Sequence, residues 1–357
     1  MSVRLRPTLA ALPAYLPGRT VPGAIKLASN EISFGPLPHV LARIAAVAAE
    51  ANRYPDSFST ELATALAARF GVQQAQVVVG CGSVSLCQQL VLATAGEGDE
   101  VLFAWRSFEA YPIITLVDGA VPIQVPLIDG VHDLPAMAAA VTERTRLIFV
   151  CNPNNPTGTA VRGPALTAFL DRIPDDVLVV LDEAYREFVT DPQVLDGTTL
   201  LERYPNIVVL RTFSKAYGLA GLRIGYGIAA DPVISNAMRQ TQVPFAVTQV
   251  GQAAALACLE AEAEVQLAER VAEVTAERAR VISELRAVGY AVPDSQANFV
   301  WLGDGPRDAG GIDGPVFAAG CEDRGVIVRA YAGSGVRVTI GSEAENDKFL
   351  SCARELR

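Results

Sequence analysis

Short apolar runs rich in Val, Ile and Leu alternate along this chain with segments that repeat apolar residues at helical spacing. The runs lie at residues 100–103, 122–125, 146–151, 177–182 and 207–212. Runs of this length and composition are typical of strands buried on both faces, and helices between them connect strands in parallel. We therefore expect an α/β fold with a largely parallel sheet, which binds its ligand at the carboxyl ends of the strands.

The last of these runs leads directly into a group of reactive side chains. Thr212, Ser214 and Lys215 follow the strand, and Arg223 comes eight positions after the lysine. Lysine is rare in this chain, with three among the 29 Lys and Arg residues. An amine condenses with an aldehyde, whereas hydroxyls and a guanidinium bind phosphate. Although a solvated loop lysine is the alternative, this grouping favours a phosphorylated aldehyde held as a Schiff base, which is pyridoxal phosphate (PLP).

Other strand ends carry polar or glycine-rich segments that suit the same ligand. Gly80-Cys81-Gly82-Ser83 joins a strand to a helix, which makes either an anion cradle or a tight turn without a ligand. Asp182 ends an apolar run, so its carboxylate needs a partner: a metal ion, a helix N-terminus or a protonated pyridine nitrogen. Asn155 lies in a turn and can also donate to a ring oxygen, and Phe108 is either a core residue or a ring-stacking one.

Composition excludes several classes of protein. The 357 residues are 50% hydrophobic and 19% charged, as in a soluble globular protein with one large and one smaller domain. The net charge of −10 argues against nucleic acid or an anionic membrane as a partner. The six cysteines and two histidines show no zinc spacing, so we expect no metal and reduced cysteines in the cytoplasm. Prolines interrupt the first apolar run, so we expect no signal peptide.

The chain divides by pattern into three parts. Prolines recur in residues 1–30, which we expect to form an N-terminal arm. Residues 31–250 contain alternating strand and helix patterns, and we expect them to form a large PLP-binding domain. Residues 251–357 form an expected small domain, which begins with a long connecting helix within 246–288 and continues with short strands and helices.

Several motifs, in order along essentially the whole chain, resemble the fold-type I PLP-dependent aminotransferases. They are Asn155-Pro156-Thr157-Gly158, Asp182-Glu183-Ala184-Tyr185, and Thr212-x-Ser214-Lys215 with Arg223. The resemblance narrows to the histidinol-phosphate aminotransferase branch, close to the bacterial aromatic amino-acid (phenylalanine) aminotransferases. The motifs that narrow it are Tyr15, Asn30-Glu31, Arg53-Tyr54-Pro55-Asp56, the Gly80-x-Gly82-Ser83 turn and Arg337-Val338-Thr339.

This resemblance implies the aspartate aminotransferase-like fold, with a large, mostly parallel α/β/α sheet domain and a smaller α+β domain. It implies catalytic roles for Lys215, Asp182 and Tyr185, and a homodimer in which Tyr54 reaches the cofactor of the partner subunit. The implied cofactor-binding residues are Ser83, Val84, Phe108, Asn155, Asp182, Tyr185, Thr212, Ser214, Lys215, Arg223 and Tyr54. The implied substrate-binding residues are Tyr15, Arg329 and Arg337.

Differences from the family pattern indicate which substrate to expect. Val84-Ser85 replaces an acidic pair after the glycine turn, and Phe108 replaces a tyrosine. These variants resemble the aromatic group, so we expect ping-pong transamination between an aromatic amino acid and a 2-oxo acid such as 2-oxoglutarate, in amino-acid biosynthesis. The alternative is histidinol-phosphate transamination in histidine biosynthesis. A PLP-dependent decarboxylase and a non-catalytic PLP-sensing domain are further alternatives.

Overall fold

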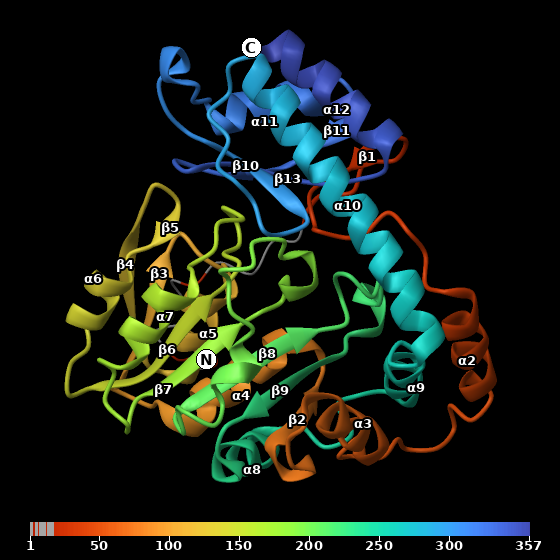
Figure 1. Cartoon of the computed structure of the whole chain (residues 1–357), viewed down its shortest axis with the longest axis vertical. Helices are drawn as coiled ribbons and strands as arrows, with labels where there is room; N and C mark the ends of the chain where they lie inside the picture. The colour runs from red at the N-terminus through yellow and green to blue at the C-terminus, as the bar shows by residue number, and fades with distance from the viewer. Residues whose placement is uncertain (1–2, 4–5, 7–11, 13–17) are drawn as a thin grey trace.

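The computed structural model describes residues 3, 6, 12 and 18–357. Its centre is an eight-stranded sheet in the order β2-β9-β8-β7-β6-β3-β4-β5. Figure 1 shows this sheet below a smaller group of strands and helices formed by the C-terminal residues. The strands are β2 (Val77–Gly80), β3 (Glu100–Trp105), β4 (Val121–Ile128), β5 (Val131–His132), β6 (Thr145–Cys151), β7 (Leu178–Asp182), β8 (Ile207–Thr212) and β9 (Gly225–Ala229).

The expected parallel sheet is present, with antiparallel additions. β4, β3, β6, β7 and β8 pair in parallel, whereas β9 is antiparallel to both β8 and β2, and β5 is antiparallel to β4. All residues of β7 and β8 are buried, and their apolar side chains alternate between hydrophobic cores on opposite faces. Val208 and Leu210 lie in one core, and Ile207 and Val209 in the other.

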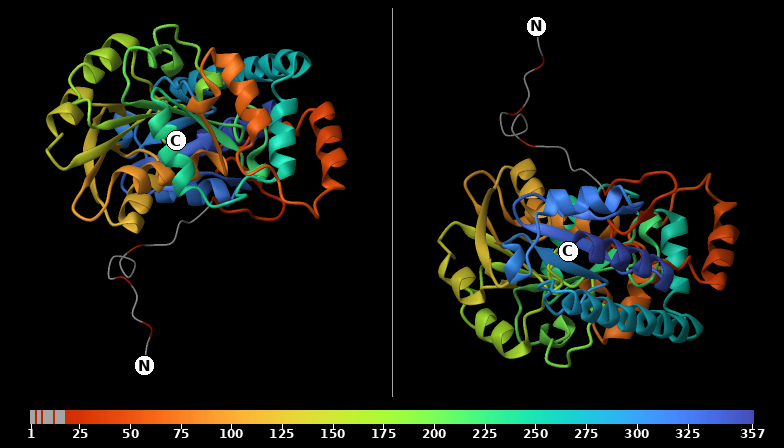
Figure 2. Two further views of the ribbon diagram at one scale, coloured as in Figure 1. Left: turned by 90° about the horizontal axis from the view of Figure 1, so that it is seen from below. Right: turned by 90° about the horizontal axis from the view of Figure 1, so that it is seen from above.

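Helices cover both faces of the sheet, which gives three layers (Figure 2). One face packs against α4 (Gly82–Thr94), α5 (Ala110–Asp118) and α8 (Pro232–Thr241). The other packs against α3 (Thr60–Phe70), α6 (Leu134–Ala139) and α7 (Gly163–Leu170). Gly71 ends α3 in the left-handed conformation expected of a C-terminal glycine. Short 3-10 helices occur at η1 (Gln74–Gln76), η2 (Arg186–Phe188), η3 (Gly197–Leu200), η4 (Ala220–Leu222) and η5 (Arg307–Ala309).

The C-terminal part forms two small sheets. β13 (Gly335–Thr339) pairs antiparallel with β10 (Phe299–Gly303) and with β12 (Arg329–Tyr331). β11 (Val326–Ile327) pairs in parallel with β1 (Ile25–Lys26), so a segment from the N-terminal region joins the C-terminal part. Sequence patterns indicated short strands in the C-terminal part, but β12 and the two-residue β5 were not among the predicted strands.

The expected helical region at 246–288 contains two helices. α9 (Gln249–Ala257) begins at Thr248, whose side chain accepts a hydrogen bond from the backbone of Gly251. α10 (Ala261–Ala287) then runs from α2 (Pro38–Ala48) to the C-terminal helices α11 (Gly314–Glu322) and α12 (Glu343–Leu356), as Figure 1 shows. Among the described residues, no helix is long and apolar enough to cross a membrane.

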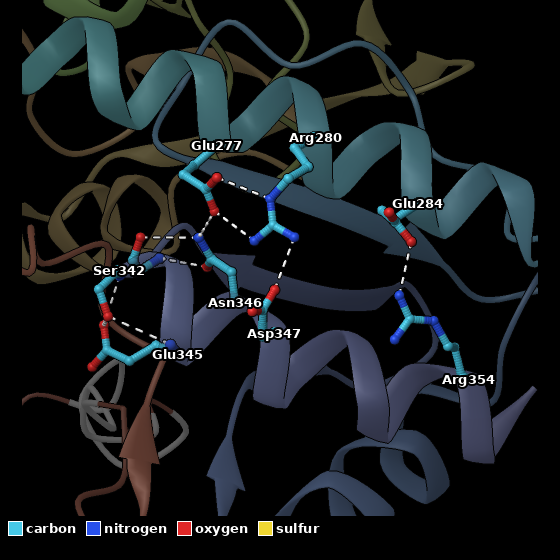
Figure 3. A network of polar contacts seen from close by, with 9 residues as sticks. Glu277, Arg280, Glu284, Ser342, Glu345, Asn346, Asp347 and Arg354 are labelled. Atoms are coloured by element: carbon cyan, nitrogen blue, oxygen red, sulfur yellow. Dashed lines mark hydrogen bonds and ion pairs between the residues drawn. The ribbon is translucent and has the colours of Figure 1, made fainter.

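A polar network joins α10 to α12 (Figure 3). Ser342 and Glu345 form a capping box that begins α12. The amide nitrogen of buried Asn346 donates to Glu277 at 2.9 Å and to the Gly341 carbonyl at 3.0 Å, while its oxygen accepts from the Gly341 N–H at 2.9 Å. This one amide therefore satisfies three groups where the two helices meet.

We predict that Asn346→Ala lowers the free energy of unfolding by about 2–3 kcal/mol, because buried polar groups of Gly341 lose their partner. The control is Arg354→Ala, which removes the exposed ion pair with Glu284 on the same two helices and should cost about 1 kcal/mol or less. Urea unfolding followed by circular dichroism measures both. Equal losses in the two variants would contradict the role of Asn346.

Candidate active site

A cavity of about 600 Å³ lies at the carboxyl ends of the central strands, facing β12 and β13. Its wall includes residues after β6, β7 and β8, the first turn of α4, and side chains of the small antiparallel sheet. The predicted site residues that line it are Ser83, Val84, Phe108, Asn155, Asp182, Tyr185, Thr212, Ser214, Lys215, Arg223, Arg329 and Arg337. Twelve separate predictions thus converge on one cavity, as expected for the carboxyl edge of a parallel sheet.

Two predicted residues lie apart from this group. Tyr54 is 82% exposed and stacks on Phe245, with ring centroids 4.6 Å apart, and it does not line the cavity of its own chain. This position is compatible with a role toward a partner subunit, which is the role that the resemblance implies. Tyr15 lies outside the described residues.

Lys215 places its amine in the cavity, where Nζ donates to the Ser29 carbonyl oxygen at 3.2 Å. Burial, together with the positive charges of Arg337 and Arg223, lowers the pKa of Lys215 to about 7. A substantial fraction of the amine is therefore neutral near pH 7, whereas an ordinary lysine is almost fully charged. A neutral amine is the nucleophile and the base that condensation with an aldehyde requires.

Asp182 is the last residue of β7 and is 3% exposed. Tyr111 in α5 donates to its Oδ2 at 2.6 Å, while the buried Oδ1 has no hydrogen-bond partner among the described residues. Burial raises the pKa of Asp182, and the hydrogen bond from Tyr111 opposes that rise. The unpartnered oxygen requires a donor from the cavity, such as a protonated ring nitrogen.

An anion cradle lies at another part of the wall. Ser83 and Val84 are in the first turn of α4, where backbone N–H groups lack helical acceptors. Ser214 Oγ accepts from Thr212 Oγ1 at 3.0 Å and from Arg223 Nη1 at 3.3 Å, which gathers two hydroxyls and a guanidinium. Gly82 has a φ of +75°, a conformation that favours glycine, and the Arg223 guanidinium lies close to it, since a Cβ there would be 2.5 Å from Nη2.

Hydrogen bonds from the small sheet and the N-terminal region hold the remaining side chains. Arg337 Nη1 donates to Asn155 Oδ1 at 2.6 Å, and Nη2 donates to the Ala28 carbonyl at 2.8 Å. Asn30 donates to the hydroxyl of Tyr185 at 2.8 Å. Burial raises the pKa of Tyr185 above its usual value, so the residue stays a neutral phenol.

The sequence analysis missed several residues that complete this site. Tyr111, Glu109 and Asn30 were not predicted to act there, although Glu109 lies in the cavity wall and Tyr111 bonds Asp182. Asn154 was also missed: its oxygen accepts from Ser107 at 2.8 Å and from buried His132 at 3.1 Å, and its nitrogen donates to the Arg106 carbonyl at 3.2 Å. These bonds hold Asn154 against Arg106 and Ser107, the two residues that precede Phe108.

Comparison with known proteins identifies the class. The family model for aminotransferases of class I and II matches residues 22–352, and the chain belongs to this family. A histidinol-phosphate aminotransferase from Sinorhizobium meliloti, solved in complex with pyridoxal-5'-phosphate, superposes with a TM-score of 0.88 at 29% identity, over 100% of this chain and 98% of that one. An aspartate aminotransferase from Thermus thermophilus, with a TM-score of 0.80 at 22% identity over 94% of this chain and 92% of that one, shares the fold.

Sequence identity is higher to two bacterial enzymes. The chain is 56% identical to the aromatic amino acid aminotransferase of Streptomyces coelicolor over 361 residues, covering 100% of this chain and 98% of that protein. It is 55% identical to the enzyme of the same name from Mycobacterium tuberculosis over 359 residues, covering 100% and 99%. The predicted family and fold are thereby confirmed.

We predict that Tyr111→Phe weakens the binding of pyridoxal phosphate by about 10- to 100-fold, because a hydrogen bond to a charged group is lost. Without it the pKa of Asp182 rises further, and less of the carboxylate is ionised to pair with the ring nitrogen. Tyr204→Phe is the control, since it removes a similar 2.7 Å bond to Asp171 outside the cavity. Fluorescence titration of the cofactor-free proteins compares them. An unchanged dissociation constant in Tyr111→Phe would contradict the role of Tyr111.

The pKa of Lys215 predicts how fast pyridoxal phosphate labels the cofactor-free protein at different pH. Because only the neutral amine reacts, the rate should rise with pH, reach half its maximum near pH 7 and level off above it. Borohydride trapping and mass spectrometry follow the Lys215 peptide separately from those of Lys26 and Lys348. A rate that continues to rise up to pH 10 would show that the cavity does not lower the pKa.

Proposed function

We propose that this protein is a homodimeric, cytoplasmic aromatic amino acid aminotransferase that uses pyridoxal phosphate to move an amino group between phenylalanine or tyrosine and a 2-oxo acid. The observation that carries this proposal is the pair formed by Lys215 and Asp182. A lysine amine with a lowered pKa and a buried carboxylate oxygen in need of a donor face the same cavity. Full-length relatives with 55–56% identity support the aromatic substrate.

The cavity residues fit pyridoxal phosphate, which supplies an aldehyde and an electron-withdrawing ring when bound. Asp182 Oδ1 would accept from the ring nitrogen, and Asn155 and Tyr185 would donate to the ring oxygen. Phe108, whose ring meets Tyr111 edge-on at 5.5 Å, would lie against the ring face. Backbone N–H groups of Ser83 and Val84 and the side chains of Thr212, Ser214 and Arg223 would bind the phosphate.

The residues of the cavity would have different roles in the reaction. Arg337 would hold the substrate carboxylate, and Arg329 would line the part of the pocket that receives the side chain. Lys215 Nζ, neutral once the substrate amine has replaced it, would take the proton from the substrate Cα and return it during the exchange. Asp182 would remain ionised and keep the ring nitrogen protonated, which favours loss of that Cα proton.

Exposed aromatic residues support the homodimer. Tyr54, Phe58 and Phe245 are 82%, 62% and 44% exposed, and the rings of Tyr54 and Phe245 stack on each other at the surface. The described cysteines are all free, as a reducing compartment requires. We also propose the division into an arm at 1–30, a large domain at 31–250 and a small domain at 251–357.

We predict that purified protein with pyridoxal phosphate and 2-oxoglutarate transaminates phenylalanine and tyrosine, with kcat/KM roughly tenfold or more above that for histidinol phosphate. Steady-state kinetics with each donor measure this ratio. Lys215→Ala should reduce the rate by several orders of magnitude, whereas Lys348→Ala removes an exposed lysine outside the cavity and should retain activity. A preference for histidinol phosphate would favour the alternative, for which the second cavity arginine is the supporting observation.

A further inference from the structure

Asn154 joins two of the segments that form the cavity wall. It is 1% exposed, and it directly precedes Asn155, which would contact the ring oxygen of the cofactor. Its side-chain oxygen accepts from Ser107 Oγ at 2.8 Å, and its side-chain nitrogen donates to the Arg106 carbonyl at 3.2 Å. The next residue after these two is Phe108, which would lie against the ring face. One buried amide therefore connects the segment of Phe108 to the segment of Asn155.

The loop that contains Asn154 is held against the turn between β4 and β5. The backbone N–H of Asn154 donates to the Thr159 carbonyl at 2.8 Å, and its carbonyl accepts from the Gly158 N–H at 2.7 Å. Its side-chain nitrogen also donates to Thr157 Oγ1 at 2.8 Å. Both threonines donate to the Gly130 carbonyl, at 2.8 and 2.6 Å. Every polar group of Asn154 thus has a partner, and the loop is joined to the residue that precedes β5.

The strand β5 brings a buried histidine to the same amide. His132 is 6% exposed, and its Nε2 lies 3.1 Å from Asn154 Oδ1. The Arg106 carbonyl can only accept, so the amide nitrogen of Asn154 faces it and the amide oxygen faces His132. The histidine must therefore donate, which places a proton on Nε2. Burial lowers the pKa of His132 to about 4, so the ring stays a neutral donor near pH 7.

We propose that His132 is a positioning residue for pyridoxal phosphate, which acts through the amide of Asn154. That amide fixes Phe108 relative to Asn155, so the face and the oxygen of the cofactor ring meet their partners together. His132 itself does not line the cavity, and its effect is transmitted by the hydrogen bond to Asn154. This inference rests on the proposed placement of the cofactor and is independent of which amino acid reacts.

The test replaces the histidine by a side chain without the donor and by one that keeps it. Nδ1 of His132 has no hydrogen-bond partner among the described residues, so His132→Leu removes a single side-chain bond. His132→Gln supplies an amide N–H in place of the ring N–H. The matched control is His39→Leu, which removes a 3.2 Å contact between Nε2 and the Ala257 carbonyl outside the cavity.

Circular dichroism of the bound cofactor measures the effect in the holoenzyme. The cofactor absorbs where the polypeptide does not, and its signal depends on how firmly the ring is held in one orientation. We expect His132→Leu to lower the signal per bound cofactor by roughly half or more and to weaken cofactor binding by roughly tenfold. His132→Gln and His39→Leu should stay within about twofold of the wild type in both measurements. Far-ultraviolet spectra of all four proteins should agree, which separates this effect from a general loss of structure.

Three results would overturn the proposal. They are a wild-type signal and affinity in His132→Leu, an equal loss in His132→Gln, and an equal loss in His39→Leu. If His132→Leu does not yield folded protein, Ser107→Ala decides, because it removes the other side-chain donor to Asn154 Oδ1. A reduced cofactor signal is expected in that variant, and an unchanged one would overturn the proposal. Failure of the wild type to transaminate phenylalanine would instead overturn the proposed function and leave these cofactor measurements intact.

Discussion

The burial of the central strands on both faces determines where chemistry can occur in this protein. β7 and β8 are buried throughout, so a charged side chain within them needs a charged partner, as Arg211 of β8 has in Glu183, and the polar groups of the cavity lie where the strands end. Asp182 shows the consequence most clearly. It is the last residue of its strand, it is fully desolvated, and only one of its two oxygens has a donor among the described side chains. The cavity therefore contains a buried carboxylate oxygen that needs a hydrogen-bond donor.

The small sheet and the N-terminal region contribute the residues that complete the cavity at the edge of the large sheet. Arg337 bridges β13 to Asn155 and Ala28, and Asn30 connects Tyr185 to the C-terminal part by accepting from Thr339. The pairing of β1 with β11 brings Asn30 to this position, since the chain passes directly from β1 into the cavity wall. The site is thus assembled from segments more than 300 residues apart, and its geometry depends on how the two parts are packed.

Most of the fold and the centre of the site could be predicted from the sequence, for identifiable reasons. Strand ends are visible as polar residues after apolar runs, which located Asp182 and Lys215, and a glycine-rich turn before a helix located Ser83. Tyr111 and Glu109 were not predictable in this way, because each lies on or beside a helix whose apolar pattern explains its neighbours. Their roles come from contacts across the fold, with Asp182 and Arg329, which neither local pattern nor spacing encodes.

The use of arginine rather than lysine around the cavity affects the protonation of Lys215. Burial and the positive charges of Arg337 and Arg223 lower the pKa of Lys215, the lysine in the cavity wall. Lysines at these positions could release their own protons, and the loss of those positive charges would reduce their effect on the pKa of Lys215. Arginine at both positions therefore favours the neutral form of the Lys215 amine.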